Sequence, residues 1–97
     1  MEITKYVDIF KALSDPNRLK ILSIINTEGE VCACKLLENF KITQPTLAYH
    51  MKMLVDSQLV SYYKRGTWCV YKIRYDEFQN IKKFIEKFEI EEMSVQK

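Results

Sequence analysis

Two cysteines, Cys32 and Cys34, stand two positions apart in this 97-residue sequence and form its sharpest chemical feature. On a regular helix, side chains at this separation point roughly 200° away from each other, so an intact turn keeps them from binding one ion together. Both can bind the same ion if Cys32 ends an extended segment and Cys34 lies in the first helical turn, or if that turn unwinds. The helix start and the neighbouring Lys35 favour the thiolate form.

The surroundings of these thiols favour a soft, thiophilic metal or metalloid as ligand, because no cluster of histidine or carboxylate side chains accompanies them. Two other interpretations stay open: a pair of small, half-buried residues, or thiols that respond to oxidation. Cys69 is the remaining cysteine. An odd number of cysteines, two of them this close, indicates free thiols or metal ligands in a reducing compartment rather than a disulfide framework.

A second group of chemically capable residues follows in the segment 42–54. Thr43 is suited to cap a helix, and Pro45 is suited to its first turn. Leu47, Met51 and Leu54 recur at helical spacing and are expected to face a core. The predicted open side carries Gln44, Thr46, Tyr49, His50 and Lys52. Such groups can read base edges and bind phosphates in a DNA groove, although an ordinary amphipathic helix with a solvated polar face is an alternative.

The other elements form a frame around these two stretches. Hydrophobic periodicity and capping residues predict helices at 3–13, 16–25, 33–39 and 44–55. They also predict one short strand at 31–32. Aromatic and β-branched runs at 59–63 and 68–75 predict a hairpin whose turn at 64–67 carries Lys64 and Arg65. Two helices joined by a short turn form a helix-turn-helix, and the hairpin would be its wing. The predicted fold is mainly α with a small β-hairpin.

Apolar stripes on the first and last helices predict packing surfaces. The stripe of the first helix consists of Ile3, Tyr6, Val7, Phe10 and Leu13, and the second helix is expected to point Leu19, Leu22 and Ile25 inward. A last helix at 76–91 carries Phe78, Ile81, Phe84, Ile85 and Phe88. Because this aromatic surface exceeds what one domain needs, we expect the terminal helices to form a homodimer. The tail 92–97 is expected to fray.

Composition and charge narrow the function further. The chain is 47% hydrophobic and 12% aromatic, enough for the core of one domain over 1–97. Residues 41–74 carry six Lys or Arg against Asp56 alone, giving +5, which indicates a polyanionic partner. Charges interrupt the apolar runs well before the ~18 residues of a membrane span, and no signal peptide is recognisable, so we expect a cytoplasmic protein without a membrane partner. The sequence lacks a glycine-rich phosphate loop and a nucleophile–base pair, which argues against an enzyme.

Four sequence blocks, in the right order, resemble the ArsR family of winged helix-turn-helix metalloregulatory repressors. They are FKALSDPNRLKIL at 10–22, EVCACKL at 30–36, TQPTLAYHMKML at 43–54 and GTWCVYKI at 66–73. The resemblance covers about residues 7–75, which is most of the chain. It implies a homodimer that binds double-stranded operator DNA and releases it when a metal or metalloid binds Cys32 and Cys34.

The resemblance also indicates which metal or metalloid would act as the inducer that releases DNA. Arsenite or antimonite, which take three sulfurs in a pyramid, fit it best, while cadmium, lead and zinc rank behind because they need further ligands. No permanently bound cofactor is expected. Lys35 replaces an aspartate of the family box, and Leu37 replaces the third cysteine of arsenic-sensing members. Cys69 is discounted as the third ligand, because it shares a strand face with Tyr71 and Ile73 and the wing lies away from the third helix in the implied fold.

The predicted DNA contacts divide into two groups. Facing the bases are Gln44, Thr46, Tyr49 and His50, and facing the phosphates are Lys52, Lys64 and Arg65. Thr43, at the start of the same helix, is also predicted to contact DNA. Ala48 and Tyr49 depart from the family pattern, which bears on the operator sequence only. One alternative is a repressor of the same fold that senses thiol oxidation. Another, of a different class, is a winged-helix module for protein contacts that does not read DNA.

Overall fold

Helices dominate residues 3–89, the part of the chain that this computed structural model describes. The elements are α1 (Ile3–Leu13), α2 (Pro16–Glu28), β1 (Glu30–Cys32), α3 (Ala33–Leu37), α4 (Gln44–Asp56), β2 (Val60–Arg65), β3 (Trp68–Ile73) and α5 (Tyr75–Glu86). The predicted order of helices, hairpin and final helix is confirmed. The expected frayed tail and the last two residues of the predicted final helix lie outside the described residues.

The three strands form one antiparallel sheet in the order β1-β3-β2. The β2–β3 hairpin is confirmed, but its turn is shorter than predicted, because Arg65 already pairs with Trp68. Gly66 (φ +64°) takes the first of the two turn positions, as in a type II′ hairpin. β1 pairs with β3 and places Cys32 opposite Val70, a pairing that the sequence did not reveal. The wing is therefore joined directly to the entry of α3.

Local capping sets where the helices begin and end. The Asp15 carboxylate accepts hydrogen bonds from the backbone N–H groups of Asn17 (2.8 Å) and Arg18 (3.1 Å) at the start of α2. The Thr43 hydroxyl accepts one from the Thr46 N–H (3.3 Å) at the start of α4, as predicted. Gly29 (φ +88°) ends α2 in a conformation that L side chains rarely adopt, and this turns the chain into β1.

The core differs from the predicted apolar stripes in two places. The largest fully buried side chains are Ile9, Ile21, Ile25, Leu36, Leu54, Leu59 and Val60. α1 buries Ile9 and Ala12, whereas Val7 and Phe10 of the predicted stripe stay exposed. Leu19 was expected to point inward, and that is wrong: its side chain is 50% exposed. α2 and α1 thus leave apolar surface outside the core.

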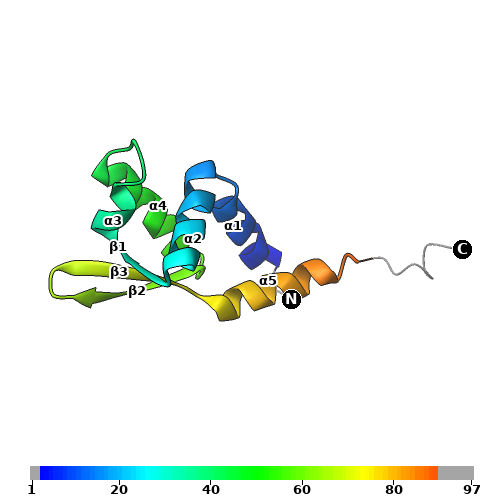
Figure 1. Cartoon of the computed structure of the whole chain (residues 1–97). Coiled ribbons are helices and arrows are strands. Elements are labelled where there is room, and N and C mark those ends of the chain that lie inside the picture. The colour runs from blue at the N-terminus through cyan, green and yellow to red at the C-terminus, as the bar shows by residue number, and fades with distance from the viewer. Residues whose placement is uncertain (1–2, 90–97) are drawn as a thin grey trace, which may run out of the picture.

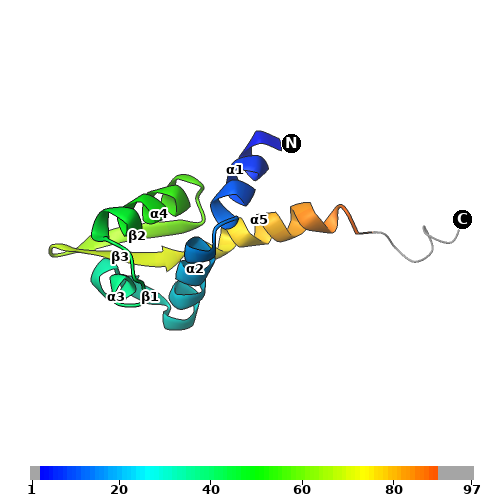
Figure 2. The same cartoon turned by 90° about the horizontal axis from the view of Figure 1, so that it is seen from above.

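The elements separate two ends of the molecule. Figure 1 shows α2, α3 and α4 on the same side of the sheet and α5 extending away from it past α1. Figure 2, seen from above, places the β2–β3 hairpin and α5 at opposite ends, with α3 and α4 beside the hairpin. The helix-turn-helix and wing therefore form one end, and the terminal helices form the other. No helix within residues 3–89 has both the length and the apolar character needed to cross a membrane.

Candidate functional site

The outer face of α4 carries polar and aromatic side chains. Gln44, Thr46, Tyr49 and Lys52 are exposed, and Tyr49 is 58% exposed. The inner face buries Leu47, Met51 and Leu54, as predicted. Because α4 follows α3 in a helix-turn-helix, this outer face corresponds to the recognition surface of the motif.

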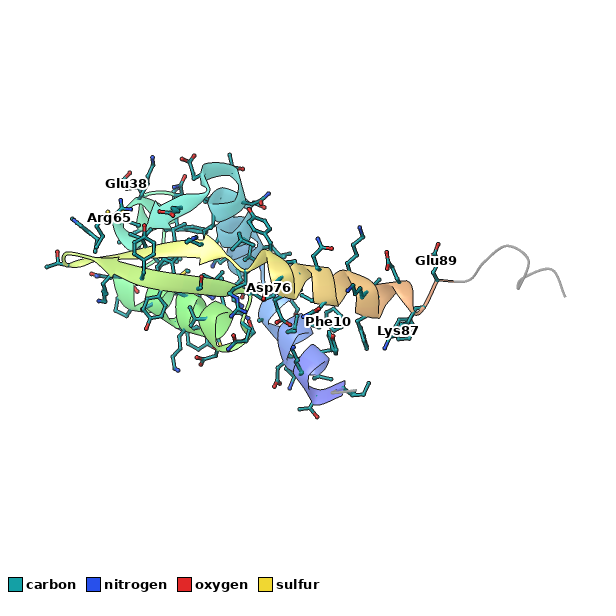
Figure 3. The ribbon with its side chains drawn as sticks, turned by 90° about the horizontal axis from the view of Figure 1, so that it is seen from below. Phe10, Glu38, Arg65, Asp76, Lys87 and Glu89 are labelled. Carbon is teal, nitrogen blue, oxygen red and sulfur yellow. The ribbon has the colours of Figure 1, made fainter. Side chains whose placement is uncertain are left out.

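The basic side chains near this surface are held in exposed, weak pairs. Lys52 contacts Asp56 at 2.9 Å, one helical turn away. On the wing, Arg65 donates to the Tyr63 hydroxyl (2.6 Å) and lies 3.7 Å from Glu30, which also accepts from Tyr63. Figure 3 shows Arg65 on the hairpin, at the other end of the molecule from Lys87. Exposed ion pairs contribute about 0–1 kcal/mol, so these basic side chains can exchange their carboxylate partners at small cost.

His50 does not lie on the open side of α4. It is only 6% exposed, and its Nδ1 atom accepts a hydrogen bond from Nη1 of Arg18 at 2.9 Å. Because arginine only donates, this contact requires a neutral His50 with its proton on Nε2. The prediction that His50 faces outward is wrong because position 50 falls on the same helical stripe as Leu47 and Leu54. The prediction assigned His50 to the open side because the residue is polar, although its position lies on the inner face.

Arg18 is a buried residue whose role the sequence did not reveal. Its side chain is 7% exposed, and Nε donates to the Ala12 carbonyl at 2.6 Å while Nη2 donates to the Lys11 carbonyl at 3.4 Å. One guanidinium thus joins the end of α1, the start of α2 and the middle of α4. The burial of Arg18 could have been predicted from its position, because it falls on the inward stripe of α2 with Ile21 and Ile25.

The thiol pair lies on backbone of the first of the two arrangements considered from the sequence, an extended segment followed by a helical turn. Cys32 ends β1 in extended backbone (φ −78°, ψ 155°) and Cys34 lies in the first turn of α3. The Cys34 thiol donates a hydrogen bond to Cys32, and the Lys35 N–H adds another, so the pKa of Cys32 is lowered. The pKa of Cys34 is raised, because that same bond holds its proton. The pair therefore combines a half-buried thiol of lowered pKa with an exposed thiol of raised pKa.

Cys69 lies nearer to this pair than expected. The wing was predicted to lie away from α3, and that is wrong, because β3 pairs with β1. Cys69 is a half-buried free thiol that lines a cavity of about 420 Å³ together with Cys34. Within residues 3–89, no three His, Cys, Asp or Glu side chains already stand together as a metal-binding group.

Comparison with known proteins identifies the family. The model for bacterial regulatory proteins of the arsR family matches residues 15–62. The arsenical resistance operon repressor of Bacillus subtilis (strain 168) is 38% identical over 79 residues, which cover 81% of this chain and 75% of that protein. The chain belongs to the arsR family.

Other ArsR-family relatives and structures agree. The arsenical resistance operon repressor of Staphylococcus xylosus is 50% identical over 68 residues, covering 70% of this chain but only 64% of the length of that repressor. A cadmium resistance regulator homologue of Staphylococcus aureus is 30% identical, covering 90% of this chain and 67% of that protein. An ArsR-like regulator from Rhodococcus sp. RHA1 has the same fold, with a TM-score of 0.77, 24% identity, and coverage of 87% and 78%.

The buried arginine of this ArsR-family chain should matter for stability. Arg18→Met keeps the length of the side chain but leaves His50 Nδ1 and the Ala12 and Lys11 carbonyls without their donor. We expect a loss of about 3 kcal/mol in the free energy of unfolding, measured by urea denaturation. Arg74→Met is the control, since Arg74 is partly exposed and its partners Asp76 and Gln58 are exposed to water, and it should cost less than about 1 kcal/mol. Equal losses in the two variants would contradict the role assigned to Arg18.

The hydrogen bond between the paired thiols should be visible in their reactivity. Cys34→Ala removes the donor to Cys32, so the pKa of Cys32 should rise and its alkylation by iodoacetamide should need a higher pH. Mass spectrometry of the modified peptides measures this pH profile, and Cys69→Ala should leave it unchanged. An unaltered Cys32 profile in Cys34→Ala would show that the thiol contact does not set its reactivity.

Proposed function

We propose that this chain is a DNA-binding transcriptional repressor that releases its operator when arsenite or antimonite binds Cys32 and Cys34. The observation that carries the proposal is the position of the thiol pair, at the junction between β1 and the first helix of the helix-turn-helix. Two of the relatives named above are arsenical resistance repressors, at 50% and 38% identity, and the cadmium resistance regulator homologue is 30% identical, which supports a trivalent metalloid ahead of cadmium, lead or zinc. We infer that residues 1–97 act as one domain, without enzymatic activity, in the cytoplasm where the operator lies.

The DNA contacts follow from the exposed surface of α4 and the wing. Gln44, Thr46 and Tyr49 present donors, acceptors and a ring that can reach base edges in a major groove. Thr43 is exposed at the start of the helix, where its hydroxyl also donates to the Thr46 hydroxyl at 3.0 Å. Lys52, Lys64 and Arg65 are assigned to phosphates. His50 is removed from the base contacts, because its ring is buried against Arg18; it supports α4 from behind.

The release step follows from the path of the backbone. A guest held by Cys32 and Cys34 must draw the end of β1 and the first turn of α3 together. α3 spans only Ala33–Leu37, and its Leu36 is fully buried, so it moves as a short rigid piece. That movement shifts the helix-turn-helix to which α4 belongs. We infer that the inducer acts by displacing α4 from the groove rather than by covering it.

The exposed apolar surface of the terminal helices supports a homodimer. The exposed side chains are Ile3, Val7 and Phe10 of α1, together with Ile85 and the adjoining Phe88. Tyr6 of α1 stacks on Phe84 of α5 with ring centroids 4.1 Å apart, which joins the two helices into one surface. Figure 3 shows Phe10 in the region where α1 and α5 meet. Two copies joined here would place two α4 helices in successive major grooves, about 34 Å apart.

The base and phosphate roles are separable by mutation. Gln44→Ala should reduce discrimination at one base pair by about 1–3 kcal/mol, whereas Lys64→Ala should weaken binding to all sequences and lower the salt slope by about 1. Fluorescence anisotropy on the operator and on single-base variants, at several salt concentrations, measures both effects. Variants that behave alike on every sequence would refute these roles, and absence of salt-dependent DNA binding would favour a protein-interaction module.

The inducer site is tested by removing both thiols. Cys32→Ser with Cys34→Ser should leave operator binding intact and abolish its release by arsenite. Release of the double variant at the same arsenite concentration as the unmodified chain would overturn the assignment. Release of the unmodified chain by peroxide, with no response to arsenite, would instead identify a redox sensor that uses the same two cysteines.

The homodimer is tested by placing a charge on the exposed apolar surface. Ile85→Asp should convert the dimer to a monomer in sedimentation velocity, because the carboxylate would be buried without a partner. Asn80→Asp adds the same charge elsewhere on α5 and should leave the dimer intact. A dimer that persists in Ile85→Asp would show that the subunits meet at another surface.

A further inference from the structure

We propose that the Tyr63 hydroxyl, held by Glu30 of β1, positions the Arg65 guanidinium for a DNA phosphate and loses this hold when an inducer moves β1. The inference rests on the proposed function and deepens it, because it adds a second route from the thiols to the DNA, through the wing. Tyr63 is a positioning residue in this account, since it acts through Arg65.

Two short hydrogen bonds run in one direction along these side chains. Nη2 of Arg65 donates to the Tyr63 hydroxyl at 2.6 Å, and that hydroxyl donates to Oε1 of Glu30, also at 2.6 Å. Because a hydroxyl carries one proton, its use on Glu30 leaves the lone pairs of Tyr63 for Arg65. The hydrogen bond to Glu30 is also the main reason why the pKa of Tyr63 is raised, so the hydroxyl keeps its proton. Glu30 therefore fixes the direction in which Tyr63 accepts from Arg65.

The hydroxyl orients the guanidinium more than the ion pair does. Nη2 of Arg65 lies 3.7 Å from Oε1 of Glu30, and both side chains are exposed, so water weakens their attraction. The Tyr63 ring adds a second contact, with its centroid 5.5 Å from the guanidinium carbon of Arg65. A guanidinium has five N–H donors, so a bond through Nη2 leaves others for a phosphate. Tyr63 thus reduces the side-chain freedom that Arg65 loses when it binds DNA.

The register of the sheet places the thiol Cys32 on the same face as this network. Cys32 is paired with Val70 of β3, and Val70 is paired with Tyr63 of β2, so these three side chains form a row across the sheet. Glu30 precedes Cys32 by two positions and therefore shares its face. Figure 3, seen from below, shows Arg65 on the hairpin of this sheet. One buried residue, Val70, thus separates the proposed inducer ligand from Tyr63.

Movement of β1 acts directly on the bond between Glu30 and Tyr63. β1 spans only Glu30–Cys32, so a guest that shifts Cys32 toward α3 also shifts Glu30. Tyr63 does not have to follow, because β3 lies between β1 and β2 in the sheet. Hydrogen bonds between oxygens extend to only about 3.0 Å, so a shift of about 1 Å breaks this one. Arg65 then regains its side-chain freedom, and its contact with phosphate weakens.

The positioning role is tested without arsenite, by fluorescence anisotropy of operator binding in a double-mutant cycle. Tyr63→Phe keeps the ring and removes the hydroxyl, so operator affinity should fall about two- to tenfold, the equivalent of one hydrogen bond. In a chain that already carries Arg65→Ala, the same change should have no effect. Tyr75→Phe is the matched control, because it removes a hydroxyl that donates to Asn26 at 2.8 Å at the start of α5, and it should leave the affinity unchanged.

Two results of this cycle would overturn the positioning role. One is an unchanged operator affinity in Tyr63→Phe. The other is an equal loss from Tyr63→Phe with and without Arg65→Ala, which would show that the hydroxyl acts independently of the guanidinium.

The link to β1 is tested by repeating the measurement at saturating arsenite. Tyr63→Phe should not alter the affinity of the arsenite-bound chain, so the ratio of operator affinities without and with arsenite should fall about two- to tenfold, by the loss of one hydrogen bond. Glu30→Ala should lower this ratio to the same extent. Glu30→Gln should preserve it, because the amide oxygen can still accept from Tyr63 and a change of charge affects both affinities alike.

The outcomes separate this inference from the proposed function. If Tyr63→Phe weakens operator binding equally with and without arsenite, the link to β1 is wrong while release through the thiols stands. If arsenite releases no DNA from the unmodified chain, the proposed function is wrong, and the cycle with Arg65 still decides the positioning role of Tyr63.

Discussion

The buried guanidinium of Arg18 is the interaction on which the arrangement of the helices depends. It reaches the carbonyls that end α1 through two donors and His50 in α4 through a third. A buried charge is tolerated only where its hydrogen bonds are made, so these three partners must stay in place together. The Asp15 carboxylate caps the same turn, and its pKa is lowered: burial raises it, but the N–H donors and the Arg18 charge outweigh that effect. α4 is thus fixed to the terminal-helix end of the molecule.

This fixed support explains how a small change at the thiols can matter for DNA binding. Arg18 holds α4 on its inner face, and α3 and β3 line a cavity along one flank of α4. The thiols lie at the junction between β1 and α3. Under the proposed function, an inducer bound there would shift α3 and the flank of α4 that it contacts, while Arg18 holds the inner face of α4 in place. The exposed ion pairs of Lys52 and Arg65 add little resistance, because each is weak in water.

Local features were predictable from the sequence, and distant pairings were not. Two helix starts are predicted by a capping residue followed closely by proline: Asp15 with Pro16, and Thr43 with Pro45. Both helices begin where expected. His50 was misplaced because residue type outweighed its position on the inner stripe, and its partner is 32 positions away.

The wing shows the same limit of local reasoning. Its hairpin follows from residues that are close in sequence, whereas the pairing of β1 with β3 joins a three-residue strand to one almost forty positions later. So short a strand carries too little pattern to identify its partner. The backbone of Cys69 comes near Cys32 only through that pairing. Because the sequence did not predict the pairing, it placed the wing away from α3.

Amide hydrogen exchange with and without arsenite measures whether binding at the thiols alters α4. We expect slower exchange at the end of β1, in α3 and in the facing part of β3, together with changed exchange in α4, and no change in α2. Arsenite that binds the thiols while exchange in α4 stays the same would contradict this expectation.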